Sequence, residues 1–203
     1  DQNDLAGTLA SWAADPVDSD GMPAVSEMLQ TVVRHQLPAG KWHVPHPNKG
    51  WSLTAHAYRL RVPLTVHPGI GYDIIYNHPV ANGAAIGRGA DIDYRVFAES
   101  ICNLDGGVFL SVGSAIMAPQ VFEKALSLAN NRRLQQGERP IVADIVVNDL
   151  AEIDWDWSSG EPPKDNPAYY LRFCKSFSRM GGNMTYLGCD NRIFLHNLCN
   201  ILS

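Results

Sequence analysis

Three short segments of the sequence carry side chains that could do chemistry, and the first lies at residues 67–79 (HPGIGYDIIYNHP). His67 and His78 are candidate general acids or bases, because histidine titrates near neutral pH without any perturbation. Gly69 and Gly71 would let the backbone approach a ligand as phosphate-binding turns do, although the full G-x-G-x-x-G pattern is absent. The alternative is a tight turn between a strand and a helix, with no ligand.

The second segment, residues 113–119 (GSAIMAP), follows an apolar run of the type found in buried strands. Gly113 and Ser114 precede an expected helix, so the amide N–H groups at the helix start could face an anion. Ser114 could equally be the N-cap of that helix, with its side chain accepting from one of those amides. The sequence leaves both interpretations open.

The third segment, residues 149–157 (DLAEIDWDW), concentrates four acids and two tryptophans in nine residues. Carboxylates beside aromatic rings suit an amine, through a cation–π contact, or the hydroxyl pair of a ribose. The alternative is an acidic surface loop whose tryptophans pack on the domain.

A metal-assisted hydrolase site could use His67, Asp73 and His78, but these residues span a strand end and a loop, and no H-x-x-x-H pair supports them. We therefore expect no metal. Four other histidines are expected at surface or hydrogen-bonded core positions: His35, His43, His46 and His56. The cysteines show no C-x-x-C spacing and are expected to be buried thiols: Cys102, Cys174, Cys189 and Cys199.

The elements that must position these side chains alternate between helices and short apolar strands. The periodicity predicts helices over 22–36, 52–60, from Asp91 or Asp93 to 101, around 121–131, and over 192–202. It predicts strands over 63–67, 108–112, 140–147 and 184–187. This alternation indicates an α/β fold with a mainly parallel sheet and helices on both faces. Ligands of such sheets bind beyond the carboxyl ends of the strands.

The composition bounds the class of protein. A chain of 203 residues with 45% hydrophobic residues can bury a core and fits one domain. We expect a loosely held, proline-rich segment at 1–49 and a folded core at 50–203. The net charge of −5 argues against a nucleic-acid partner, and no apolar run is long enough for a membrane helix. The low charged fraction, 18%, suggests that another chain covers part of the surface. A cytoplasmic location is expected.

Residues 50–202 resemble deoxyhypusine synthase, and resemble more closely a group of related bacterial proteins without an assigned reaction. The resemblance rests on four stretches: SLTAHAYRLRVPLTVHPGIGYDIIYNHP, LDGGVFLSVGSAIMAPQVFEKALSLANN, IVVNDLAEIDWDW and MTYLGCDNRIFLHNL. It implies a Rossmann-like domain, assembled as a homotetramer, with NAD bound between subunits and an amine such as spermidine as a substrate.

The resemblance also implies roles for individual residues. Asp73 takes the place of the acid that holds the polyamine, and Gly113 lies in the glycine run beside NAD. Asp154 and Asp190 match acids that contact the nucleotide. Together with the residue types above, this gives candidate cofactor-binding residues Gly69, Gly71, Gly113, Ser114, Asp154 and Asp190. The candidate catalytic residues are His67, Asp73, His78 and Arg172.

Two departures from the family pattern argue against deoxyhypusine synthesis. A Lys-His-His segment that supplies the substrate histidine is replaced by residues 114–117 (SAIM). The W-G-K motif with the imine-forming lysine is replaced by Tyr170-Leu171-Arg172. An arginine stays protonated and cannot be the amine nucleophile, although Arg172 could clamp a phosphate or carboxylate. Lys175 would need a shift in register to serve.

We therefore expect a protein that binds NAD or another nucleotide, together with a small cationic or amine-bearing ligand, at the carboxyl edge of the sheet. Its chemistry would be redox or group transfer. The alternative is a non-catalytic homo-oligomeric module that retains only the fold.

Overall fold

The structure is a computed structural model that describes residues 22–37, 43, 45–114, 116–151, 153–171 and 176–203. The chain separates into two compact units, residues 1–96 and 97–203. Each unit is described by itself. The predicted division into a loosely held segment at 1–49 and a single folded core stays a prediction, and residues 1–21 of that segment lie outside the described residues.

The first unit is built from helices and turns. Its elements are α2 (Met22–Arg34), η3 (Lys49–Trp51), α3 (Leu53–Leu60), η4 (Ile74–Asn77) and the first part of α4 (Gly83–Cys102). The predicted helices 22–36 and 52–60 are confirmed as α2 and α3. Ser52 caps α3 by accepting a hydrogen bond from the amide of Ala55, and Arg61 ends the helix in the left-handed region at φ 56°.

The predicted strand at 63–67 is wrong, because the described residues 62–69 form no strand. A β-branched run becomes a strand only where a neighbouring strand accepts its ladder of hydrogen bonds. Pro63 offers no amide to such a ladder. The amide of Val66 instead donates to the carboxylate of Asp93 at 2.8 Å, so a helix side chain takes the place of a strand.

The start of α4 also differs from the prediction, since the helix begins at Gly83 rather than at Asp91 or Asp93. The amide of Ala85 donates to Asn82 Oδ1 at 2.7 Å, so a buried asparagine caps the first turn. Asp91 lies inside the helix and pairs with Arg95. Glycines within residues 83–89 obscure this start in the sequence, because glycine disfavours helix interiors.

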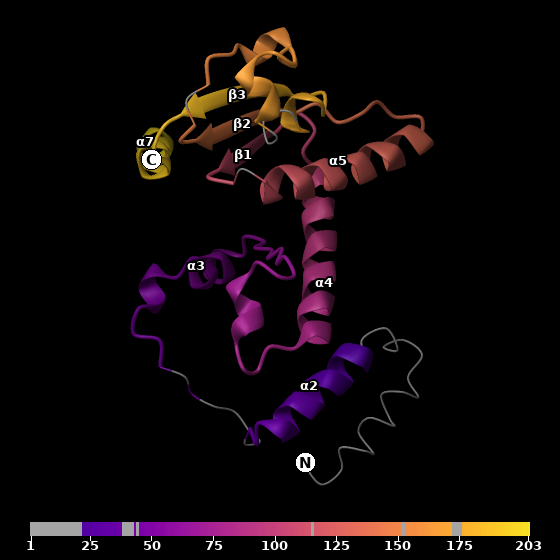
Figure 1. Ribbon diagram of the computed structural model, residues 1–203, viewed down its shortest axis with the longest axis vertical. Coiled ribbons are helices and arrows are strands. Elements are labelled where there is room, and N and C mark those ends of the chain that lie inside the picture. Colours follow the sequence, from indigo (N-terminus) through magenta and orange to yellow (C-terminus); the bar gives the residue numbers. More distant parts are fainter. Residues whose placement is uncertain (1–21, 38–42, 44, 115, 152, 172–175) are drawn as a thin grey trace. The chain divides into compact units, whose positions relative to one another are not determined.

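The second unit contains a three-stranded parallel sheet (Figure 1). Its elements are the last turns of α4, β1 (Val108–Val112), α5 (Met117–Gln135), β2 (Asp144–Asp149), η5 (Trp157–Ser159), η6 (Pro167–Tyr170), β3 (Asn183–Gly188) and α7 (Asn191–Leu202). The strands stand in the order β1-β2-β3, with Leu110 opposite Val146 and Val146 opposite Thr185. The predicted α/β class and the predicted strand at 108–112 are confirmed. Strand β2 begins at Asp144, whereas the sequence predicts a strand that begins at residue 140.

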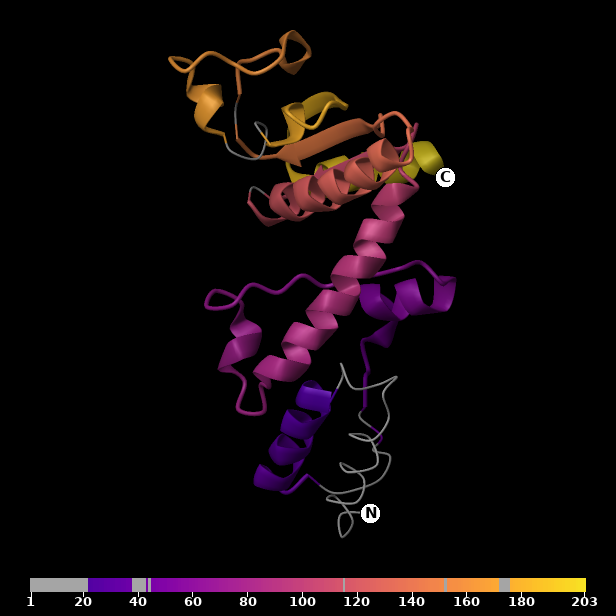
Figure 2. The same cartoon turned by 90° about the vertical axis from the view of Figure 1, so that its right-hand side faces the viewer.

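An aromatic cluster joins α5 to one face of the sheet. The ring of Phe109 on β1 lies 4.1 Å from that of Phe122 on α5, and Phe177 completes the cluster at 5.8 and 5.5 Å. Phe122 and Phe177 are fully buried. Figure 2 shows α5 running along the sheet. The opposite face leaves Val108 57% and Leu110 41% exposed, so helices on both faces stay a prediction.

No helix among the described residues combines the length and apolar character that crossing a membrane requires.

The expected burial of the cysteines is wrong for Cys199, which is exposed on α7, while Cys102 and Cys189 are partly exposed. Helix α7 has no buried residue in this chain, so its cysteine stays in contact with solvent. Cys174 lies outside the described residues.

Candidate functional site at the carboxyl edge of the sheet

The three parallel strands of the second unit end at one edge, where α7 begins (Figure 1). β1 is followed by Gly113, β2 ends with Asn148 and Asp149, and β3 is followed by Cys189 and then by Asp190. Loops and helix starts that meet at this edge are where open α/β sheets bind ligands.

Gly113 occupies a position that favours glycine. Its φ of 70° lies in the left-handed region, and a Cβ there would come 2.5 Å from Nδ2 of Asn191. Its amide donates to the carbonyl oxygen of Asn148 at 3.0 Å, which extends the β1–β2 pairing by one residue. The end of β1 is therefore fixed by β2 and by the start of α7.

Asn148 is the centre of this edge. Only 1% of the residue is exposed, and its Nδ2 donates to Asn191 Oδ1 at 2.6 Å and to the carbonyl of Cys189 at 3.3 Å. Its Oδ1 accepts from the Cys189 thiol at 2.9 Å. Gly113, Asn148, Cys189 and Asn191 form what we call the carboxyl-edge network. Sequence reasoning missed Asn148 and Asn191, although an asparagine in the apolar run IVVND was a usable signal.

Asp190, a predicted cofactor-binding residue, lies beside this network as the N-cap of α7. Its carboxylate accepts from the guanidinium of Arg192 at 3.1 and 2.9 Å and from the Arg192 amide at 2.8 Å. These bonds, the guanidinium bond first, lower the pKa of Asp190 from 3.8 to about 2. At neutral pH the edge therefore presents an ionised carboxylate next to a guanidinium that is 91% exposed.

The other predicted residues of this unit have separate positions. Ser114 is not the N-cap of α5, which is Ile116, but its Oγ accepts from the amide of Ala118 in the first turn at 3.0 Å. Asp154 is exposed in the segment after β2. Trp157 is buried, and Trp155 donates to the carbonyl of Gly160 at 3.0 Å, as expected for an acidic loop whose tryptophans pack on the domain.

The predicted residues His67, Gly69, Gly71, Asp73 and His78 all lie in the first unit. The carboxylate of Asp73 accepts from the amide of Gly69 and closes a turn. Gly71 has a φ of 92° and open space around it. Tyr72 packs where a side chain on Gly69 would lie. These contacts favour the interpretation of this segment as a tight turn.

The two histidines of that segment make local hydrogen bonds. His67 shares one with Thr65 at 3.0 Å, and partial burial lowers the pKa of His67, opposed by the charge of Asp93. His78 Nδ1 accepts from the amide of Val80 at 3.3 Å. Over the described residues, no group of three or more His, Cys, Asp or Glu side chains is arranged to hold a metal ion.

Arg172 and Lys175 lie outside the described residues.

No protein-family model matches the sequence, and no significantly similar protein was found among curated proteins or among solved structures.

Proposed function

We propose that the second unit binds NAD or another nucleotide at the carboxyl edge of its sheet, in a Rossmann-like domain of the deoxyhypusine synthase type. The observation that carries this proposal is the carboxyl-edge network, in which Asn148 connects the ends of all three strands. A buried amide with three protein partners holds the surrounding backbone in place before a ligand arrives, which lowers the entropic cost of binding.

The charged groups beside the network suit the parts of a nucleotide. The ionised carboxylate of Asp190 is 33% exposed and can accept hydrogen bonds from ribose hydroxyls. The exposed guanidinium of Arg192 can bind a phosphate through two parallel hydrogen bonds.

A second ligand of cationic or amine-bearing type fits the same edge, because two carboxylates lie there: Asp149 is the last residue of β2, and Asp190 is the N-cap of α7. A bound nicotinamide would supply hydride-acceptor chemistry, while the protein binds and orients the substrate. Deoxyhypusine synthesis is not proposed, since the sequence has Arg172 where the family motif has the imine-forming lysine.

A thermal-shift titration of the full chain with NAD, NADH and spermidine tests the proposal. A ligand that binds only the folded state stabilises it by about 2.7 kcal/mol at a hundredfold excess over Kd. Asp190→Asn should weaken binding, because it removes the charge while asparagine still caps α7. Asp156→Asn is the matched control, since Asp156 caps η5 in the same way. No shift with NAD or NADH, or equal binding by the Asp190 variant, would overturn the proposal.

A second candidate function is the non-catalytic homo-oligomeric module. It is supported by the apolar side chains exposed on one sheet face, Val108, Leu110 and Leu187, because parallel sheets normally bury both faces. Sedimentation equilibrium of the wild type and of Leu110→Lys tests it. An oligomer that dissociates in the variant, with no nucleotide binding by either protein, would favour the module. A monomeric wild type would exclude it.

A further inference from the structure

A long stretch of the first unit is free of acidic residues. Between Glu27 and Asp73 the sequence has no Asp or Glu, although the whole chain has 21 of them against 16 Lys and Arg. The same stretch carries five cations (Arg34, Lys41, Lys49, Arg59 and Arg61) and five of the seven histidines. An acidic chain thus has one local region of the opposite sign, which attracts anions.

Two adjoining hollows lie within this region, and Lys49 and Tyr58 line both of them. The first has a volume of about 560 Å³ and is also lined by His46, Ser52 and Thr54. The second has a volume of about 490 Å³ and is also lined by His56 and Arg59. We call the pair the basic hollow. Each volume is in the range of pockets that hold one small molecule.

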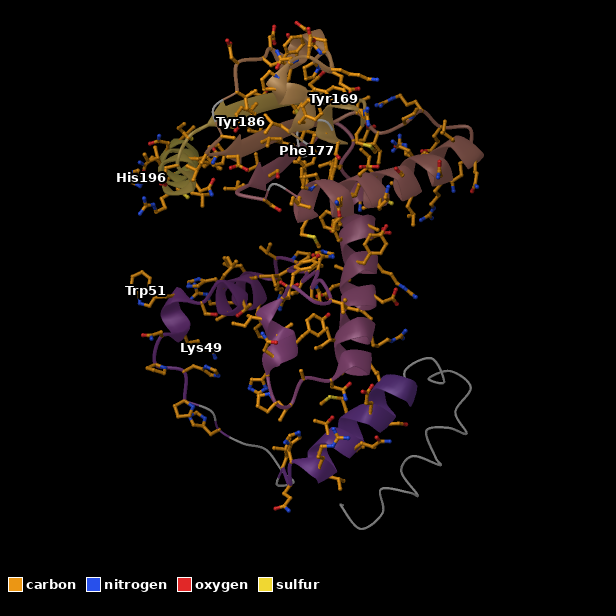
Figure 3. All side chains as sticks on the ribbon, viewed as in Figure 1. Lys49, Trp51, Tyr169, Phe177, Tyr186 and His196 are labelled. Atoms are coloured by element: carbon orange, nitrogen blue, oxygen red, sulfur yellow. The ribbon has the colours of Figure 1, made fainter. Side chains whose placement is uncertain are left out.

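The cations of the basic hollow are not neutralised by carboxylates. Among the ion pairs of the described residues, none involves Lys49 or Arg59. Lys49 is exposed. Figure 3 shows it on η3 with its neighbour Trp51. Exposed cations without a described carboxylate partner can bind an anion at little cost, since no existing ion pair must break.

Arg59 is held in position by a histidine rather than by an acid. Its Nη2 lies 2.8 Å from His56 Nδ1, and His56 Nε2 lies 2.6 Å from the carbonyl oxygen of Gly50. Arginine can only donate and the carbonyl can only accept, so in this geometry His56 accepts at Nδ1 and donates from Nε2. A partner that is not a carboxylate orients the guanidinium and leaves its charge available.

Hydroxyl and aromatic groups complete the site. Ser52 and Thr54 share a hydrogen bond at 2.9 Å in the first hollow, and Tyr58, which lines both hollows, is 88% exposed. Cations and hydroxyls beside an exposed aromatic ring suit a phosphate attached to a planar group. From these contacts we infer that the basic hollow binds a small phosphorylated molecule, at a site separate from the carboxyl-edge network.

Calorimetric titration of the full chain with inorganic pyrophosphate and with AMP tests this inference. The double variant Lys49→Gln/Arg59→Gln should bind both probes at least about tenfold more weakly, because a hydrogen bond to a charged group contributes about 1.5 to 3 kcal/mol. The matched control Lys124→Gln/Arg95→Gln has the same change in net charge at exposed ion pairs elsewhere and should bind as the wild type does.

Additional variants and salt conditions show whether charge at the basic hollow carries the binding. Lys49→Arg should retain binding of pyrophosphate, and raised salt should weaken it, because the charge carries the interaction. The thermal shift that NAD gives should be the same in Lys49→Gln/Arg59→Gln as in the wild type, because neither residue belongs to the carboxyl-edge network, so this inference and the proposed nucleotide site can fail separately. No binding of either probe, equal binding by the double variant, or tighter binding of a ten-nucleotide single-stranded RNA would overturn it.

Discussion

Nδ2 of Asn148 donates a hydrogen bond of 2.6 Å to Oδ1 of Asn191, which joins the end of strand β2 to the first residue of α7. The two residues are 43 positions apart in the chain. Asn191 in turn occupies the space that a side chain at residue 113 would need, so Gly113 depends on the same contact. Strand ends, turn and helix start therefore form one cooperative structure at the carboxyl edge.

Asn148→Ala should lower the free energy of unfolding by about 1 to 3 kcal/mol, because it removes a buried side chain and leaves partly buried polar groups of Asn191 and Cys189 without their hydrogen-bond partner. Urea unfolding followed by circular dichroism measures this loss. Asn183→Ala is the control: it removes an exposed hydrogen bond to Asp144 and should change stability by less than about 0.5 kcal/mol. Equal losses in the two variants would contradict the central role of Asn148.

Gly113→Ala should be more destabilising than Gly137→Ala, although both glycines have a positive φ, of 70° and 76°. The left-handed conformation costs a non-glycine residue about 1 to 2 kcal/mol at either position. Only at Gly113 does the new Cβ also meet a neighbour, since the space around Gly137 is open. Chemical denaturation compares the two variants. In the double variant Gly113→Ala/Asn191→Ala the added cost of the collision should disappear, as a double-mutant cycle would show.

The Asp190 carboxyl should make stability depend on acid pH. Its pKa is about 2 in the folded protein against 3.8 for the ordinary side chain, so the stabilisation is complete above pH 3.8. It is lost as the pH falls from there through about 2, because the unfolded chain binds the proton first. Carboxyl resonances in an NMR titration report this pKa directly.

Arg192→Gln should raise the pKa of Asp190 toward 3.8, since the guanidinium hydrogen bond is the largest cause of its lowering. The same NMR titration compares the variant with the wild type. An ordinary pKa for Asp190 in the wild-type protein, or an identical pKa in both proteins, would contradict the ion pair.

Phe122→Ala should destabilise the second unit by about 3 to 5 kcal/mol, because this ring is fully buried between the rings of Phe109 and Phe177. Such a loss is large against the stability of an ordinary domain. Ile116→Ala, at a residue that is 58% exposed beside the start of α5, is the control and should be nearly neutral. Thermal unfolding of the full chain compares the variants.

The order of strands and helices between residues 108 and 202 was predictable because its signals are local. Apolar runs such as 108–112 and the helical spacing in 192–202 depend only on neighbours in the chain. Local signals failed where pairing decides the outcome. The run 63–67 has strand composition, but no strand among the described residues pairs with it, and Asp93 on α4 binds the amide of Val66 instead.

The candidate site divides in the same way. Gly113 and Asp190 could be selected from the sequence, because a glycine after a strand and an acid before a helix are recognisable patterns. Asn148 and Asn191 could not be paired from the sequence, since their contact exists only once parallel strands bring distant segments to one edge. The amino-acid sequence thus determined which elements form, through local preferences, whereas tertiary structure decided which side chains meet.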